Sequence, residues 1–303
     1  MIPIFPSSKK LELTDREEIE NFTKSFAPYS DYNFVSLYSY NTQNLTELSY
    51  LNNNLVILFE DYITEEPVYS FIGINNLEDT ARKLLDRAHE LNILDQLKLI
   101  PEGNFGEHIH GIPGFDAIED PDNFDYILSV DKLSKLEGGE FQDKRNLYNR
   151  FGIENPDAEI KKLDLTNSQT KDEILNLFDT WVERKGKSIE ETEHEKTAIK
   201  RLLKASNFFN LISIGIFKNN RLISFAISEI VNNNFSVFHF VKADIEFKGN
   251  FETTYKTLAS ELKKSGVLFI NYEQHLGIEN LKKSKELWRP VGFLKKYTIS
   301  KID

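Results

Sequence analysis

The chain has 303 residues, of which 40% are hydrophobic and 28% charged, a composition typical of a globular protein with two domains of about 150 residues each. It contains no cysteine, which excludes disulfides, zinc sites built on thiolates and cysteine nucleophiles. With 48 acidic and 37 basic side chains, the net charge is −11, which argues against a large nucleic-acid-binding surface.

The first half of the chain predicts two helices, two strands, a longer helix and a further strand. Thr14-Asp15-Arg16-Glu17 has the form of a capping box, so we expect the first helix to begin there. The predicted elements are helices over residues 14–26, 31–40 and 77–91 and strands over residues 55–59, 68–72 and 97–100.

The second half repeats this order: two helices, a three-strand meander, then helix, strand, helix and strand. Asn-containing turns separate the meander strands, and Asn tolerates the positive φ of tight hairpins. The predicted helices are 171–185, 193–205, 251–264 and 278–288, and the predicted strands are 211–217, 222–231, 235–240, 267–271 and 292–299. We place the domain boundary at Asn155-Pro156, which gives domains 1–155 and 156–303.

Residues 1–10 contain two prolines and no long apolar core, unlike a secretory signal. No window approaches the roughly 20 apolar residues that a membrane span requires. We therefore expect a soluble protein in the reducing cytoplasm, with peripheral contact to a membrane surface left open.

The order meander, central strand, helix, strand, helix and a final strand with Gly292-Phe293 resembles the acetyltransferase-like (GNAT) acyltransferase fold. This resemblance implies an α/β protein with two tandem GNAT-like acyl-N-acyltransferase lobes, each a mixed, mostly antiparallel sheet flanked by helices. Users of acyl-CoA carry a glycine-rich loop before the main helix, whose amides bind pyrophosphate. Here residues 246–251 contain only Gly249, so coenzyme A is disfavoured and no cofactor is predicted.

Three sequence blocks resemble a bacterial family related to the C-terminal catalytic domain of phosphatidylglycerol lysyltransferase (lysyl-phosphatidylglycerol synthase). The first block comprises Asp125, Tyr126, Leu133, Leu136, Gly138, Gly139, Lys144, Arg145, Asn146, Asn149 and Phe151. The second comprises His239, Phe240, Val241, Lys242, Ala243, Asp244 and Gly249. The third comprises Asn271, Tyr272, Glu273, Gln274, His275, Leu276, Gly277, Leu281, Lys285, Pro290, Lys296 and Tyr297. His275 departs from the family pattern, which has an acidic residue at this position.

The resemblance implies transfer of an aminoacyl group from aminoacyl-tRNA, bound through its 3′ end, to an unknown acceptor. The acceptor classes are a lipid head group, a peptide and a small amine. Two alternatives stay open: an acyl-CoA-dependent N-acetyltransferase, and a non-catalytic binding module on the same fold.

Aminoacyl transfer needs a group that takes a proton and donors for the developing oxyanion. Lys242 and Asp244 end the predicted central strand, and Asn271, Glu273 and His275 alternate at the end of the next. Catalytic roles are predicted for Lys242, Asp244, Glu273 and His275, with Asn271 binding substrate. Glu273, Asp244 and His275 are candidates for the base or for binding the donor α-amino group. A local Lys242–Asp244 ion pair is the structural alternative.

A basic stretch near the end of the chain is a candidate anion site. Lys285 and Arg289 are four residues apart in a predicted helix and so share a face, to which Lys282 adds a third charge. Lys144, Arg145 and Asn146 are expected across the same cleft. A solvated helix face is the common alternative for such a run.

No metal site is predicted. His108 and His110 form a pair, but Glu107 alone does not complete a ligand set. Sequence motifs of nucleotide-binding loops and of serine-hydrolase elbows are also absent.

Overall fold

The computed structural model describes residues 1–106, 112–232 and 234–302 and contains two compact units. The first unit comprises Met1–Tyr126, Gln274–Lys283 and Phe293–Asp303, and the second comprises Ile127–Glu273 and Ser284–Gly292. Within the described ranges, no helix has the length and apolar character needed to cross a membrane. His108 and His110, the histidine pair discussed above, lie outside the described residues.

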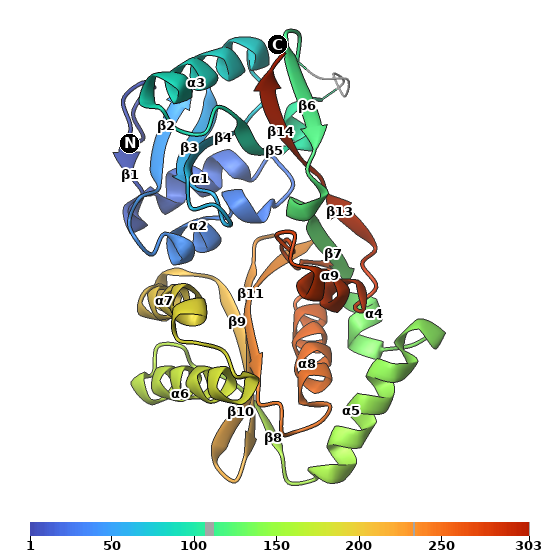
Figure 1. Ribbon diagram of the computed structural model, residues 1–303. Helices are drawn as coiled ribbons and strands as arrows, with labels where there is room; N and C mark the ends of the chain where they lie inside the picture. Colours follow the sequence, from blue (N-terminus) through green and yellow to red (C-terminus); the bar gives the residue numbers. More distant parts are fainter. Residues whose placement is uncertain (107–111, 233, 303) are drawn as a thin grey trace. The chain divides into compact units, whose positions relative to one another are not determined.

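The first unit contains a seven-stranded sheet of order β1-β2-β3-β4-β5-β14-β6 (Figure 1). β4 and β5 are parallel, whereas β2, β3 and β4 form an antiparallel meander and β14 is antiparallel to both β5 and β6. The strands are β1 (Lys9–Lys10), β2 (Glu47–Leu51), β3 (Asn54–Glu60), β4 (Pro67–Ile72), β5 (Leu97–Pro101), β6 (Phe115–Glu119) and β14 (Lys296–Lys301). The helices are α1 (Arg16–Thr23), α2 (Phe34–Tyr40) and α3 (Leu77–Leu91).

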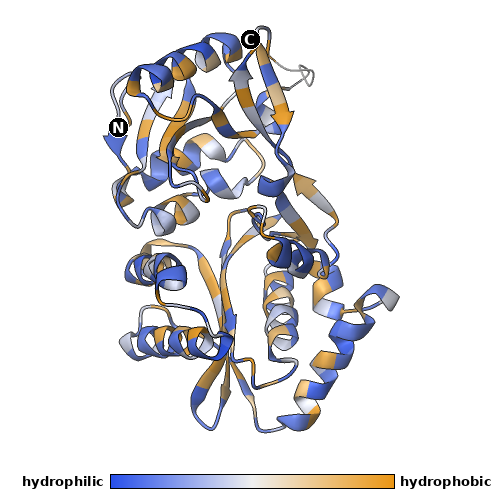
Figure 2. Cartoon of the chain, in the orientation of Figure 1, coloured by the Kyte–Doolittle hydropathy of each residue, from blue (hydrophilic) through white to orange (hydrophobic). Residues whose placement is uncertain are grey.

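The core of the first unit forms where α3 packs on the sheet. Ala81, Leu84, Leu85 and Ala88 recur at helical spacing and form one buried cluster with strand residues such as Phe71. Figure 2 shows hydrophobic residues along the central strands of both sheets. Burial of this apolar stripe, rather than local propensity alone, therefore stabilises α3.

A charged network is also buried in the first unit. The Lys296 ammonium lies 2.7 Å from an Asp125 carboxylate oxygen and also pairs with Asp31, and all three side chains are 3% exposed or less. Ser30 donates its hydroxyl to Asp125, and Gln274 donates its amide to Asp31. Burial lowers the pKa of Lys296, but the two aspartates outweigh this and raise it overall, whereas burial raises the pKa of Asp31.

The second unit contains another seven-stranded sheet, of order β13-β7-β12-β11-β10-β9-β8. β11 and β12 are parallel, and β9, β10 and β11 form an antiparallel meander. The strands are β7 (Asp125–Ser129), β8 (Glu159–Lys162), β9 (Leu211–Lys218), β10 (Arg221–Ile230), β11 (Phe235–Ala243), β12 (Phe269–Asn271) and β13 (Gly292–Leu294). The helices are α4 (Val130–Lys135), α5 (Gln142–Glu154), α6 (Ser168–Lys185), α7 (Glu190–Ala205) and α8 (Asn250–Lys264). The helix α9 (Glu279–Glu286) is divided between the two units after Lys283.

Helices cover both faces of the second sheet. α6 and α7 lie on one side, and α8 lies on the other, packed against α4 and α5 (Figure 1). This is the layered arrangement that buries a mixed sheet on both sides. The predicted α/β class, with two mixed sheets flanked by helices, is confirmed.

The predicted repeat of pattern is also present. Each unit has a meander, then a helix (α3 or α8), then a strand parallel to the last meander strand (β5 or β12). The predicted elements correspond to observed ones, and the last predicted strand is divided into β13 and β14. The elements that were not predicted are β1, β2, β6, β7, β8 and α4. The start of the first helix also differs from the predicted capping box at Thr14. Asp15 accepts a hydrogen bond from the Glu12 amide, and α1 begins at Arg16.

The compact units differ from the predicted division at Asn155-Pro156. β7 precedes that point but pairs with β12 of the second sheet, and β14 follows it but pairs with β5 and β6 of the first. Each sheet is thus completed by a strand from the other predicted half of the chain. We refer to β7 and β14 as the exchanged strands.

Candidate functional site

The two parallel strands of the second sheet separate after a short contact. β11 pairs with β12 from Phe235 to Val237, and β12 ends at Asn271. β11 continues to Ala243, paired with β10 on its other side. Residues 238–243, which we call the open segment of β11, therefore have a strand on one side only within the described chain.

An irregularity in the sheet lies at the start of the open segment. β10 pairs Ser228 with Phe238 and Ile227 with Phe240, so the register skips His239. An extra residue of this kind bends a strand and redirects a side chain, and such bulges are common beside functional sites. The sequence of the strand gives no sign of it.

Two glutamates face the buried His239 ring from different strands. Nε2 lies 3.7 Å from a Glu229 carboxylate oxygen on β10, and Nδ1 lies 3.8 Å from a Glu273 oxygen just after β12. Burial lowers the pKa of His239, but the two glutamate carboxylates outweigh it and raise the pKa to about 9. The two carboxylates thus favour the imidazolium form of His239.

Glu273 reaches this position through an unusual backbone conformation. Its φ is +56°, and its amide donates a 2.7 Å hydrogen bond to the side-chain oxygen of the buried Asn271. The predicted alternation of Asn271, Glu273 and His275 along one strand is therefore wrong, because β12 ends at Asn271. His275 belongs to the first unit, where its Nε2 lies 3.3 Å from Asp122.

Lys242 and Asp244 lie at the end of β11 as predicted, but each is paired with another side chain. Lys242 lies 2.6 Å from Glu195 of α7 and 4.3 Å from the centre of the Trp181 ring. Asp244 is buried and pairs with Arg184 and, at 2.7 Å, with Arg221. The predicted Lys242–Asp244 pair is therefore not formed, and both charges are compensated by other partners.

The segment around Lys144 lies next to the segment around Arg289, as expected. Lys144 lies 4.3 Å from the centre of the Trp288 ring, and Arg289 directs Nε toward the Glu140 carbonyl at 3.5 Å. Arg145 donates to the carbonyls of Leu136 and Gly138. Asn146 is exposed on α5.

The predicted helical face of Lys282, Lys285 and Arg289 does not form. α9 ends at Glu286, and Arg289 has a φ of +55°, so Lys285 and Arg289 do not follow one helical turn. Lys285 is buried and donates to the Tyr272 carbonyl, while Lys282 is partly buried on α9. An ammonium held in this way is not presented to a solvent anion.

Sequence reasoning assigned no role to Glu229 and His239. His239 stands in the second family block, but an isolated histidine in an apolar strand is commonly a core residue. The usable signal was Glu229, the one carboxylate in a mostly apolar strand, because a buried charge requires a compensating partner.

The N-terminus of α8, where the GNAT fold binds pyrophosphate, is covered by the chain itself. At Gly249 (φ +81°) a Cβ atom would lie 2.7 Å from the Leu147 carbonyl carbon of α5 and closer still to its oxygen. In the first turn of α8, the Glu252 carboxylate is buried and pairs with Lys144 at 3.1 Å. A carboxylate already occupies the positive end of the helix dipole, so these residues do not fit a bound pyrophosphate.

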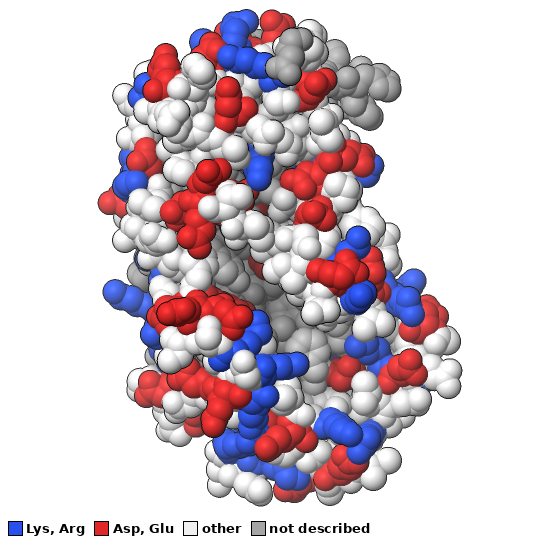
Figure 3. Space-filling view, viewed as in Figure 1, with Lys and Arg blue, Asp and Glu red and all other residues white. Residues whose placement is uncertain are grey.

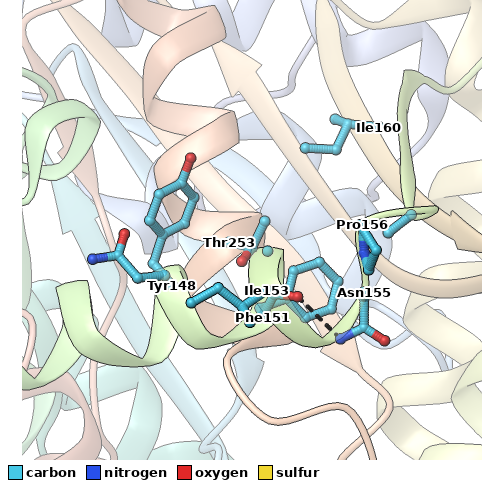
Figure 4. A pocket seen from close by; sticks show the side chains of 10 residues that line it. Tyr148, Phe151, Ile153, Asn155, Pro156, Ile160 and Thr253 are labelled. Carbon is cyan, nitrogen blue, oxygen red and sulfur yellow. Dashed lines mark hydrogen bonds between the residues drawn. The ribbon is translucent and has the colours of Figure 1, made fainter.

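A separate pocket of about 570 Å³ lies beside α5 (Figure 4). None of the predicted site residues lines it. Its lining residues are Tyr148, Asn149, Phe151, Gly152, Ile153, Asn155, Pro156, Ala158, Ile160 and Thr253. Asn155 donates its amide to the Phe151 carbonyl at 3.1 Å, which fixes the end of α5 that forms one wall.

Basic and acidic side chains are interspersed on the face shown in Figure 3. Within the described part of the chain, no three His, Asp or Glu side chains are grouped so as to hold a metal ion.

A meander, a helix and a parallel strand that separates from the last meander strand, present in both units, define a tandem acetyltransferase-like acyltransferase fold. The sequence matches the family described as "Phosphatidylglycerol lysyltransferase, C-terminal" over residues 30–300. The chain belongs to this family, which supports a transferase role.

Two solved structures illustrate the similarity. A conserved protein of unknown function from Bacteroides thetaiotaomicron is 27% identical, with a TM-score of 0.84 and full coverage of both chains. L-PGS from Bacillus licheniformis is 12% identical with a TM-score of 0.62, covering 100% of this chain and 94% of that one, which shows a shared fold. No curated protein matches the chain in sequence.

Proposed function

We propose that this protein transfers an aminoacyl group from the 3′ end of aminoacyl-tRNA to an amine or hydroxyl acceptor. Membership of the phosphatidylglycerol lysyltransferase family supports transfer of this kind. Lys242 and Asp244 pair with other side chains, and the carboxylate that we assign to the donor is that of the partly exposed Glu273, beside the open segment of β11. The acceptor is a lipid head group, a peptide or a small amine, and the donor places the reaction in the cytoplasm.

In this reaction the acceptor nitrogen or oxygen attacks the ester carbonyl carbon of the donor. The new bond to that carbon forms, the bond to the ribose oxygen breaks, and the acceptor's proton passes to the released ribose hydroxyl. A neighbouring anion favours the ammonium of the aminoacyl group. We assign this role to Glu273, whose carboxylate is held beside the gap between β11 and β12.

The closed N-terminus of α8 is the observation that carries the choice of donor. Acyl-CoA would require its pyrophosphate at the first amides of this helix. There the Leu147 carbonyl touches Gly249, and Glu252 would repel the phosphates. An aminoacyl ester of adenosine carries no pyrophosphate and does not need this position.

A thermal unfolding experiment tests the proposal. We expect a non-hydrolysable aminoacyl-adenosine mimic to raise the melting temperature, since a ligand at a hundred times its Kd stabilises the folded state by about 2.7 kcal/mol. Coenzyme A and acetyl-CoA at the same concentrations are expected to leave the melting temperature unchanged.

The matched control is Glu273→Gln, which keeps the shape of the side chain and removes its charge. This variant is expected to lose most of the stabilisation by the mimic. Stabilisation by coenzyme A alone would refute the proposed donor, and a chain that neither the mimic nor charged tRNA stabilises would instead fit the binding-module alternative.

A further inference from the structure

We propose that His239 is a positioning residue that holds the carboxylate of Glu273 beside the open segment of β11. The inference rests on the proposed function, in which Glu273 receives the ammonium of the aminoacyl donor. His239 itself is buried and acts through Glu273 rather than on the substrate.

The geometry links three strands of the second sheet through one imidazole ring. Glu229 is fixed within β10, opposite Val237 of β11, and His239 follows on β11 at the point where the register is interrupted. The ring then lies 3.8 Å from Glu273, immediately beyond the end of β12. The ring thus links a residue in the middle of the sheet to one at its open edge.

Each ring nitrogen of His239 faces a carboxylate. This geometry determines which protonation state of the imidazole suits both carboxylates. A neutral imidazole has one donor and one acceptor, so one glutamate would face a lone pair. An imidazolium has donors on both sides and attracts both carboxylates. The histidine therefore acts as a bridge only in its protonated form, in agreement with its raised pKa.

The two glutamates differ in access to solvent. The Glu229 side chain is 5% exposed and that of Glu273 is 19% exposed. Glu273 is therefore the carboxylate of the cluster that a ligand can reach, and a carboxylate is suited to a primary ammonium. His239 contacts both carboxylates and so connects the accessible one to the buried one.

The first test uses the protonation state of His239 and needs no substrate. In protein with ¹³C-labelled histidine, the imidazole signals of the six histidines are followed from pH 5 to pH 10, and His239→Gln identifies the relevant one. We expect this signal to remain that of an imidazolium at pH 7 and to titrate near pH 9. Glu229→Gln and Glu273→Gln should each lower the midpoint, whereas His194→Gln, on the surface of α7, should not.

The second test separates positioning from folding. His239→Gln leaves Glu229 buried without its cation, so Glu229→Gln/His239→Gln is made as well to restore neutrality. Both variants are expected to lose roughly 10- to 100-fold in kcat/KM for aminoacyl transfer, the range for the loss of one close interaction between charged groups. A merely structural histidine predicts instead that the double variant regains the wild-type rate.

The outcomes separate the two proposals. A neutral His239 at pH 7, a midpoint unaffected by Glu273→Gln, or a double variant with the wild-type rate would each overturn the positioning role. If the wild-type protein transfers no aminoacyl group while His239 still titrates with Glu273 as expected, the proposed function fails and the bridge between the two glutamates stands.

Discussion

Gly249→Ala is expected to destabilise the second unit by about 2–5 kcal/mol. The left-handed backbone of Gly249 costs an alanine about 1–2 kcal/mol, and forcing a methyl group into packed backbone costs about 1–3 kcal/mol more. The neighbouring atoms belong to the Leu147 backbone, which cannot rotate away as a flexible side chain would. Thermal and urea unfolding of the purified variant measure the effect.

Gly152→Ala is the matched control for this experiment. Gly152 lies in α5 itself, and apart from its chain neighbours and the helix's own backbone no atom lies within 4 Å of the position where its Cβ would be. Alanine there is expected to stabilise the helix by roughly 0.5–1 kcal/mol. Equal stability of the two variants would show that α5 does not pack on the N-terminus of α8.

Lys296→Met is expected to destabilise the first unit by about 3–5 kcal/mol, because it leaves Asp31 and Asp125 buried without their cation. Lys295→Met removes the adjacent, half-exposed pair with Glu119 and should cost no more than about 1 kcal/mol. Chemical unfolding of both variants under identical conditions gives the comparison. Similar losses of unfolding free energy in the two variants would contradict a structural role for the buried interaction of Lys296 with Asp31 and Asp125.

The pH dependence of Lys296→Met follows from the same charges. In the wild-type protein the raised pKa of Lys296 gives a stabilising contribution that is complete below pH 10.5 and is lost as the pH rises through the folded-state value. In the variant, the buried Asp31, whose pKa burial raises, can take up a proton as the pH falls. We therefore expect the difference from wild type to narrow between pH 7 and pH 5.

Elements with a strong local pattern could be predicted from the sequence. The helix at residues 77–91 has the predicted bounds because its apolar stripe and its flanking asparagines agree on them. β7 was missed, although its residues carry part of the family resemblance, because its neighbour β12 lies about 140 residues later in the chain. Local periodicity contains no information about such a partner.

The location of the candidate site could be predicted from the sequence, but the interaction partners of its residues could not. The polar ends of two neighbouring strands predicted where Lys242, Asp244, Asn271 and Glu273 would be found. Their partners depend on tertiary packing: Arg184 comes from α6, and Arg221 is the first residue of β10. The grouping of Lys285 with Arg289 failed because α9 stops three residues before Arg289.

Because of the exchanged strands, the first sheet is completed only late in the synthesis of the chain. β6 is joined to its sheet through β14, so the first sheet cannot be completed until residues 296–301 have been made, after the rest of the second unit. Until then β5 and β6 carry unpaired backbone groups along a sheet edge, which is the kind of surface that promotes aggregation. We therefore expect a nascent chain halted before Lys296 to be bound by chaperones even though it contains nearly all of the sequence.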